Sequence, residues 1–324
     1  MIYNKIRIKG ENMKKVLRAN IYFLIILIIE IFGPYALRPL YILLNVSDIR
    51  MILLFNHLIL FLIPAIIYLI FTKESVKDTL KLNKLHWQET LLIILLAFVV
   101  QPVMTFFSLI STFFFNNEVG SFIYEITSTP YILLLGLVAL LPSITEEITV
   151  RGIVLSGYEN KNKYVAAAIT GLFFGIFHLD GQQFLYAVVL GFIFALVVRI
   201  TNSIYSSMIM HFIINGTSVT LAKISKIITE SLPIATEATD FSLKNISSQE
   251  KISLIVTYGF IAVVFSIFVF LIIYGLEKIK LKRTLVEGNR LIEIEDSKEK
   301  VLNIPFILII IIYLLFMIPN VIKG

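Results

Sequence analysis

Charged and polar residues recur at a spacing of four positions in three otherwise apolar segments of the chain. The segments contain Glu146-Glu147-x-x-x-Arg151, Phe174-x-x-x-His178 and His211-x-x-x-Asn215. Residues four apart lie on one face of a helix, so each of the three helices would present one such face. Because polar groups are costly in lipid, residues of this kind in membrane helices are expected to have a function.

The two adjacent glutamates have different expected partners. Glu147 precedes Arg151 by four residues, the favourable order for an ion pair within a helix. Glu146 points about 100 degrees away around the helix and is left free. Pro142, one turn earlier, cannot donate a backbone hydrogen bond, which predicts a kink that admits water beside Glu146.

A free glutamate, two histidines and an asparagine are sufficient to hydrolyse an amide. We expect Glu146 and one imidazole to take a proton from water. The second imidazole and the Asn215 amide can donate hydrogen bonds to the oxyanion. The sequence contains no HExxH, GxGD or GxSG motif, and its lack of cysteine excludes a cysteine nucleophile and disulfides.

One carboxylate and two imidazoles are also the ligand set of many catalytic zinc sites, and here they would be Glu146, His178 and His211. If Glu146 were a ligand, however, no general base would remain, because Glu147 is committed to Arg151. We therefore favour water activation without a metal or other cofactor and keep zinc as the alternative.

The composition describes the surroundings of these residues. Hydrophobic residues make up 58% of the 324 residues and charged residues only 15%, unlike a soluble domain. This predicts an all-α, polytopic membrane protein, a transmembrane helical bundle with a central polar cavity. At about 20 residues per span there is room for eight or nine helices. Spans are expected near 20–43, 51–72, 89–115, 128–156, 164–179, 183–199, 203–223, 252–276 and 301–322.

The net charge of +6 concerns orientation rather than nucleic-acid binding, because lysine and arginine in short loops mark the cytoplasmic side. The leader and the connections 73–88, 157–163, 199–202 and 277–300 are basic, and nine spans put all five on one side. We expect a cytoplasmic leader at 1–19, one transmembrane domain at 20–322 in the plasma membrane, and a charged cytoplasmic loop at 277–300.

Helical rise places the polar residues at similar depths. Counting about 1.5 Å per residue from the basic turns puts Glu146, His178, His211 and Asn215 within about 8 Å along the membrane normal. They would then share one cavity, with Phe174 as a wall. Other polar residues have simpler explanations: His57 can form a hydrogen bond between helices, and Glu30 and Arg38 can neutralise each other or reach the interface.

The three motifs, in this order and on consecutive membrane segments, resemble those of the CPBP family. This family comprises the type II CAAX prenyl endopeptidases and the bacterial Abi-type proteins linked to bacteriocin processing and immunity. The resemblance covers roughly residues 128–222, which would form the catalytic core, and every motif residue matches. It implies an integral membrane endopeptidase, often labelled a metallopeptidase. The Glu146 position would activate water with the help of the His178 position, while the His211 and Asn215 positions would stabilise the oxyanion.

A substrate must reach a site inside the bilayer, so we expect a hydrophobic or lipid-anchored peptide, with membrane lipid as the other partner. Members of the family also act as immunity or scaffold proteins, and a non-catalytic role of that kind is the alternative. A transporter should contain internal repeats with paired broken helices. The two halves of this chain show no convincing repeat, which makes a transporter the least favoured class.

Overall fold

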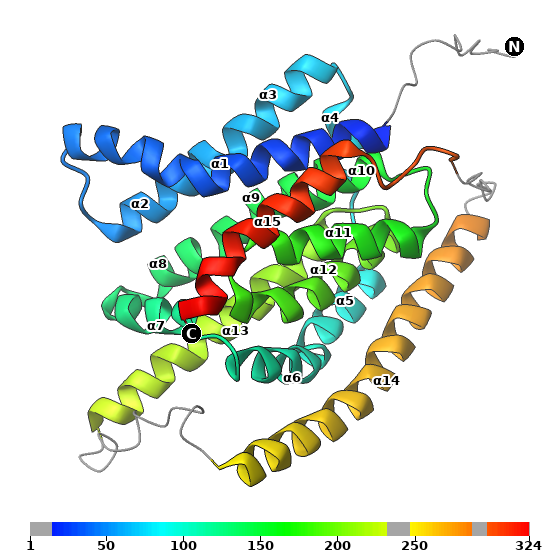
Figure 1. The fold of residues 1–324 in the computed structure, drawn as a ribbon. Helices are drawn as coiled ribbons and strands as arrows, with labels where there is room; N and C mark the ends of the chain where they lie inside the picture. Colours follow the sequence, from blue (N-terminus) through cyan, green and yellow to red (C-terminus); the bar gives the residue numbers. More distant parts are fainter. Residues whose placement is uncertain (1–14, 232–246, 287–296, 324) are drawn as a thin grey trace, which may run out of the picture.

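The computed structural model describes residues 15–231, 247–286 and 297–323, and within these ranges all regular secondary structure is helical (Figure 1). The first half contains α1 (Lys15–Leu43), α2 (Ile49–Asn56), η1 (His57–Leu62), α3 (Ile63–Thr72), α4 (Val76–Thr79), α5 (Trp87–Val99), α6 (Gln101–Thr112), α7 (Glu118–Glu125) and η2 (Ile126–Ser128). The second half contains α8 (Tyr131–Leu135), η3 (Gly136–Leu140), α9 (Leu141–Glu147), η4 (Ile148–Val154), α10 (Leu155–Gly157), α11 (Lys163–Phe177), α12 (Gly181–Thr201), α13 (Tyr205–Ser231), α14 (Ser248–Val286) and α15 (Ile304–Lys323).

These helices confirm the prediction of an all-α, multi-pass membrane protein. Among the described residues, six helices are long and apolar enough to cross a membrane, and two shorter apolar helices occur at 163–177 and 304–318. Two expected boundaries differ. Helix α14 continues through 277–286, which we had expected in a charged loop, and its polar side chains contact the bundle there: Glu277 pairs with Lys163, Lys280 donates to the carbonyl oxygen of Thr201, and Arg283 pairs with Glu89. Helix α1 begins at Lys15, inside the expected leader, and residues 1–14 and 287–296 lie outside the described residues.

Helices α11 and α12 form the most closely packed pair of the bundle, because glycines line their contact. A Cβ atom on Gly171 would lie 2.6 Å from the backbone nitrogen of Phe192, and one on Gly191 would lie 2.8 Å from the Cα of Gly171. Small residues let helix backbones approach closely in membranes. This contact holds the end of α11, where His178 lies, against the start of α12.

The helical segment at 131–157 carries the two glutamates and is irregular. Its α-helical pieces are interrupted by two π-helical stretches, η3 before Pro142 and η4 after Glu147. Proline removes the donor that the carbonyl four residues earlier would use, which here is the carbonyl of Val138. Wide turns of this type occur frequently at functional sites. The predicted irregularity at Pro142 is therefore present.

The basic connections gather at one end of the bundle. Glu159, in the 157–163 turn, is 2.6 Å from Lys81 and 3.7 Å from Lys15. Arg199 donates to the carbonyl oxygens of Tyr158 and Lys161. These contacts join the start of α1, the 73–88 connection, the 157–163 turn and the end of α12 at one face, as the charge pattern predicted.

Candidate active site

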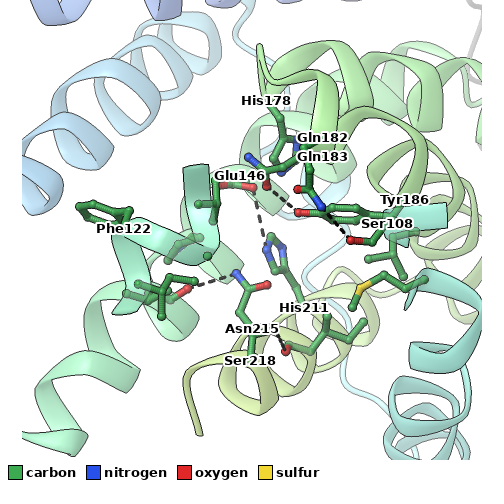
Figure 2. Close-up of a pocket in the computed structure, with 18 of the residues that line it drawn as sticks. Ser108, Phe122, Glu146, His178, Gln182, Gln183, Tyr186, His211, Asn215 and Ser218 are labelled. Atoms are coloured by element: carbon green, nitrogen blue, oxygen red, sulfur yellow. Dashed lines mark hydrogen bonds and ion pairs between the residues drawn. The ribbon is translucent and has the colours of Figure 1, made fainter. Parts of the chain in front are cut away.

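A cavity of about 500 Å³ lies inside the bundle, and the sequence-predicted residues meet there. Its lining includes residues contributed by α9, α11, α13 and the segment after α11: Glu146, Phe174, His178, His211 and Asn215. Figure 2 shows the side chains of Glu146 and His211 facing one another, with Asn215 nearby. The three motifs thus contribute to one space, as the depth argument expected.

Glu147 anchors the buried part of the site. Its Oε1 atom accepts a hydrogen bond of 3.0 Å from Nη1 of Arg151, and both side chains are fully buried. The same oxygen lies 2.9 Å from Nδ1 of His211. The sequence had assigned Glu147 to Arg151 alone. The carboxylate in fact holds two partners, because α13 brings His211 against α9.

Aromatic rings cover the rest of the Arg151 guanidinium. Its central carbon lies 3.9 Å from the centre of the Phe174 ring and 5.0 Å from that of Phe194. A cation over the face of an aromatic ring is attracted electrostatically, and this attraction is stronger away from water. Phe174 also meets His178 and His211 edge-on. Phe174 therefore connects the charged pair to both histidines, beyond its expected role as a wall.

Glu146 is the unpaired carboxylate. Its Oε2 atom is buried and has no hydrogen-bond partner within the described residues. The nearest charged or imidazole nitrogen is Nε2 of His211, 3.9 Å away, which is too far for a direct hydrogen bond. A water molecule placed between the two atoms would reach both. The sequence prediction that Glu146 is free while Glu147 is paired matches this geometry.

His211 is oriented by the two glutamates. A carboxylate only accepts hydrogen bonds, so the bond to Glu147 requires a proton on Nδ1 of His211. The opposite ring atom, Nε2, then faces Glu146. Two ionised glutamates, a charged Arg151 and a neutral His211 carry a net charge of −1. One additional proton, on Glu146 or on His211, makes the four side chains neutral as a group. Burial favours such a balance because uncompensated charge in a low dielectric is costly.

His178 is held differently from our expectation. Its Nδ1 atom donates a hydrogen bond of 2.7 Å to the carbonyl oxygen of Phe174, which leaves Nε2 as an acceptor. No direct hydrogen bond joins His178 to Glu146 in the described part of the chain, although both line the cavity. If Glu146 and His178 act on the same water molecule, that water must lie in the cavity between them.

Asn215 is positioned by the proline kink. Its Nδ2 atom donates a hydrogen bond of 3.1 Å to the carbonyl oxygen of Val138, the same carbonyl that loses its donor to Pro142 (Figure 2). A primary amide has two N–H groups, so a second donor of Asn215 remains for a ligand in the cavity. The helix irregularity at Pro142 thus supplies the acceptor that holds the Asn215 side chain in place.

Two polar residues outside the motifs lie near the site, and His57 forms the hydrogen bond between helices that the sequence analysis considered. His57, at the start of the π-helical η1, lines the cavity, and its Nδ1 is 2.9 Å from Oγ1 of Thr145. Glu30 has a buried Oε1 without a partner and lies within electrostatic range of Glu146 rather than pairing with Arg38. A polar residue within an apolar span was the only available signal for either.

The zinc alternative requires Glu146, His178 and His211 to point at one metal ion. No group of three or more His, Cys, Asp or Glu side chains among the described residues is spaced to hold a metal ion. Nδ1 of His211 is bound to Glu147 and Nδ1 of His178 to a backbone carbonyl, so Nε2 is the atom of each ring that could bind a metal. As arranged here, Glu146, His178 and His211 do not form a three-ligand site.

Comparison with known proteins gives a family match for the same segment. Residues 128–217 match the model of the family described as type II CAAX prenyl endopeptidase Rce1-like. Searches of the curated proteins and of the solved structures returned no match. The matched segment begins before α8 and ends in α13, and it contains all three motifs. Residues 128–217, which supply the motif residues of the cavity, are thus similar to the type II CAAX prenyl endopeptidase Rce1-like family, in agreement with the resemblance of the motifs.

Proposed function

We propose that this protein is an intramembrane endopeptidase that uses water as the nucleophile and Glu146 as the general base. One observation carries the proposal: the buried, unpartnered Oε2 of Glu146 faces Nε2 of His211 at 3.9 Å across a cavity. A carboxylate without a protein partner is free to take a proton from water. The family match at 128–217 supports a membrane endopeptidase of the CAAX type.

The proton would move in two steps. Glu146 takes one proton of the water while the hydroxide oxygen bonds to the scissile carbonyl carbon. When the carbon–nitrogen bond breaks, Glu146 returns that proton to the departing amine nitrogen. His178 presents an acceptor nitrogen to the same cavity and can hold the second hydrogen of the water. No covalent intermediate with the protein is needed.

Two groups would stabilise the oxyanion. His211 can donate from Nε2 when both of its ring nitrogens carry a proton, since Nδ1 is already bound to Glu147. Asn215 donates the amide hydrogen that Val138 does not use. Donors held in place before the reaction stabilise developing charge without reorganising. Pro142 contributes indirectly, because the carbonyl that it leaves without a donor fixes Asn215.

We propose a membrane-associated or lipid-anchored peptide as the substrate. The cavity lies among membrane-spanning helices, and its lining away from the motifs is largely apolar, including Leu53, Met104, Phe122, Leu137 and Ile214. The charge pattern supports a cytoplasmic N-terminus in the plasma membrane. A leader peptide or bacteriocin precursor would fit the same cavity as a prenylated peptide.

The test is cleavage of a farnesylated peptide with a CAAX terminus by the purified protein, followed by mass spectrometry. Glu146→Gln should reduce the rate at least about 10²-fold, since general base catalysis contributes that much or more. Glu230→Gln, at an exposed position on α13, is the matched control and should be unaffected. Full turnover by Glu146→Gln would remove this residue from the mechanism.

A chelator experiment addresses the metal. We propose that activity survives prolonged treatment with a strong chelator and that elemental analysis finds no stoichiometric zinc. Activity that is lost and then restored only by added zinc would assign a glutamate and histidines as ligands instead. If no peptide is cleaved under any condition, the non-catalytic immunity or scaffold role becomes the better account of the cavity.

A further inference from the structure

A second group of polar side chains lines the same cavity and has no part in the proton transfers described above. We call it the amide wall: Gln182, Gln183 and Tyr186 from the first turns of α12, with Ser108 from α6. Figure 2 shows these side chains gathered near Glu146 and His178, away from Asn215. Tyr186 lies within electrostatic range of Glu146.

The hydrogen bonds inside the amide wall orient its two carboxamides. Gln182 donates from Nε2 to Oγ of Ser108 at 2.8 Å, and Tyr186 donates from its hydroxyl to Oε1 of Gln183 at 2.7 Å. The remaining bond of the Gln183 amide, to Oδ2 of Asp180, is long at 3.4 Å. The rotamers of both glutamines are thus fixed by neighbours before any ligand binds.

The same bonds leave one acceptor and one donor unused. All side-chain hydrogen bonds of Gln182 in the described structure use Nε2, so its Oε1 has no protein partner. Gln183 has a second N–H on Nε2 beyond its bond to Asp180. A free acceptor and a free donor on neighbouring side chains are complementary to one residue of an extended peptide, which offers its N–H and its C=O on the same side.

A purely structural role, in which these polar residues only hold α6 and α12 together, explains fewer of the hydrogen-bonding groups than a binding role does. A polar network that only holds α6 and α12 together would need the Gln182 to Ser108 bond and nothing more. It would not place a second glutamine and a tyrosine along the cavity in a membrane protein, where unsatisfied polar groups are costly. The excess hydrogen-bonding capacity faces the space in which the substrate must lie.

The charge of the neighbourhood selects the kind of ligand. Asp180 caps α12 by accepting from the backbone N–H groups of Gln182 at 2.7 Å and Gln183 at 3.4 Å. The helix N-terminus is therefore already occupied by a carboxylate, and Glu146 adds a second one nearby. A free carboxylate of a ligand would be repelled here. An uncharged peptide group within a chain would not.

We propose that Gln182 and Gln183 bind the backbone of one substrate residue next to the cleaved bond, with Oε1 of Gln182 accepting the N–H of that residue and Nε2 of Gln183 donating to its C=O. This rests on the proposed peptidase function and names how the peptide is held. Because only backbone atoms are contacted, recognition at this position is independent of the substrate side chain. Tyr186 is a positioning residue that orients Gln183.

Binding can be measured apart from cleavage. A fluorescent farnesylated CAAX peptide is titrated into the Glu146→Gln protein in nanodiscs, first alone and then with Gln182→Met or Gln183→Met added. Methionine has nearly the same size and removes the amide. We expect each change to weaken binding about 3-fold to 10-fold, the usual range for one lost hydrogen bond. Gln101→Met, on α6 and outside the cavity lining, is the matched control and should bind normally.

A modified peptide tests the contact itself. An ester replaces the amide whose N–H would meet Gln182; this removes that hydrogen and weakens as an acceptor only the carbonyl of the preceding residue, which does not meet Gln183 in the proposed arrangement. The ester should bind about 3-fold to 10-fold more weakly than the amide to the protein with Gln182. With Gln182→Met the two peptides should bind equally. A general loss of structure would weaken both peptides together and could not produce this pattern.

The outcomes separate the two proposals. Equal affinities for all glutamine variants, or an ester penalty that persists with Gln182→Met, would overturn the amide wall as a peptide site. Binding that shows the expected pattern, with no cleavage by the wild-type protein, would support the amide wall and contradict the peptidase function. Loss of binding by Gln101→Met to the same degree would also count against a specific contact.

Discussion

Two groups of charged residues in this protein contain the same kinds of ion pair but differ in burial. The central cluster consists of Glu146, Glu147, Arg151 and His211, and the pair at its base is fully buried. The end cluster joins Lys15 and Lys81 to Glu159, whose side chain is 41% exposed. Water can solvate each member of the end cluster separately. In the central cluster each charge is stabilised only by its neighbouring side chains, so removing one side chain leaves the charges of the others uncompensated.

The comparison also explains why the central cluster can perform chemistry. At the end of the bundle, the one carboxylate of the cluster, Glu159, has two lysines within reach, and water competes for all three side chains. In the centre, Glu147 takes Arg151 and His211, and Glu146 is left facing a cavity. Groups that might have paired with Glu146 have other partners: the Arg151 guanidinium binds Glu147 and lies over the Phe174 ring, Nδ1 of His211 binds Glu147, and one N–H of Asn215 binds Val138.

The largest effect on stability is expected from Arg151→Met. Removing one member of a buried pair should cost about 3–5 kcal/mol of unfolding free energy, because Glu147 would remain buried without its cation. Unfolding with SDS in mixed micelles measures this. Adding Glu147→Gln to the Arg151→Met protein should cost much less than Glu147→Gln alone. Costs that simply add would show that the two side chains do not depend on each other.

A smaller effect is expected where a buried contact is neutral. His57→Leu removes the hydrogen bond to Thr145 without leaving a charge, so it should cost about 1 kcal/mol in the same assay. His57→Asn keeps a donor near the Nδ1 position and should be more stable than His57→Leu. If His57→Leu were as damaging as Arg151→Met, charge would not be what distinguishes the central cluster.

A still smaller effect is expected from Lys81→Met in the end cluster. Exposed ion pairs contribute about 0–1 kcal/mol, and salt screens them. The cost of Lys81→Met should therefore shrink in about 1 M salt, where the screening length is a few ångströms, while the cost of Arg151→Met should not. Equal salt dependence of the two variants would contradict the difference in burial.

The smallest effect is a pH dependence in the end cluster. Burial raises the pKa of Glu159, but the hydrogen bond from Lys81 and the charges of Lys81, Lys15 and Arg199 outweigh it, so this pKa is lowered. A lowered folded pKa gives stability that is present above the unfolded pKa and lost as pH falls through the folded value. The Tm advantage over Glu159→Gln should be present at pH 7 and decline progressively as the pH falls below the unfolded value of about 4.3. An advantage that persists in acid would contradict this.

Much of the candidate site could be predicted from residue spacing, because spacing on a helix is a local property. The pairing of Glu147 with Arg151 and the irregularity at Pro142 depend only on residues within two turns, and both are present. The shared cavity followed from counting helical rise from basic turns. His57 and the glutamines of α12 could not be found this way, because their importance depends on which helices are neighbours.

The sequence alone determined the membrane environment, the helical runs and the polar face of each motif helix, since composition and the 3.6-residue period act along the chain. Only the tertiary structure decided the partners. The packing of α13 against α9 gave Glu147 a second hydrogen bond and turned His211 toward Glu146. The packing of α13 against η3 placed Asn215 on the carbonyl of Val138, which Pro142 leaves without its helical donor. Hydrogen bonds need their atoms within about 3 Å, and no pattern in a single helix fixes distances between helices.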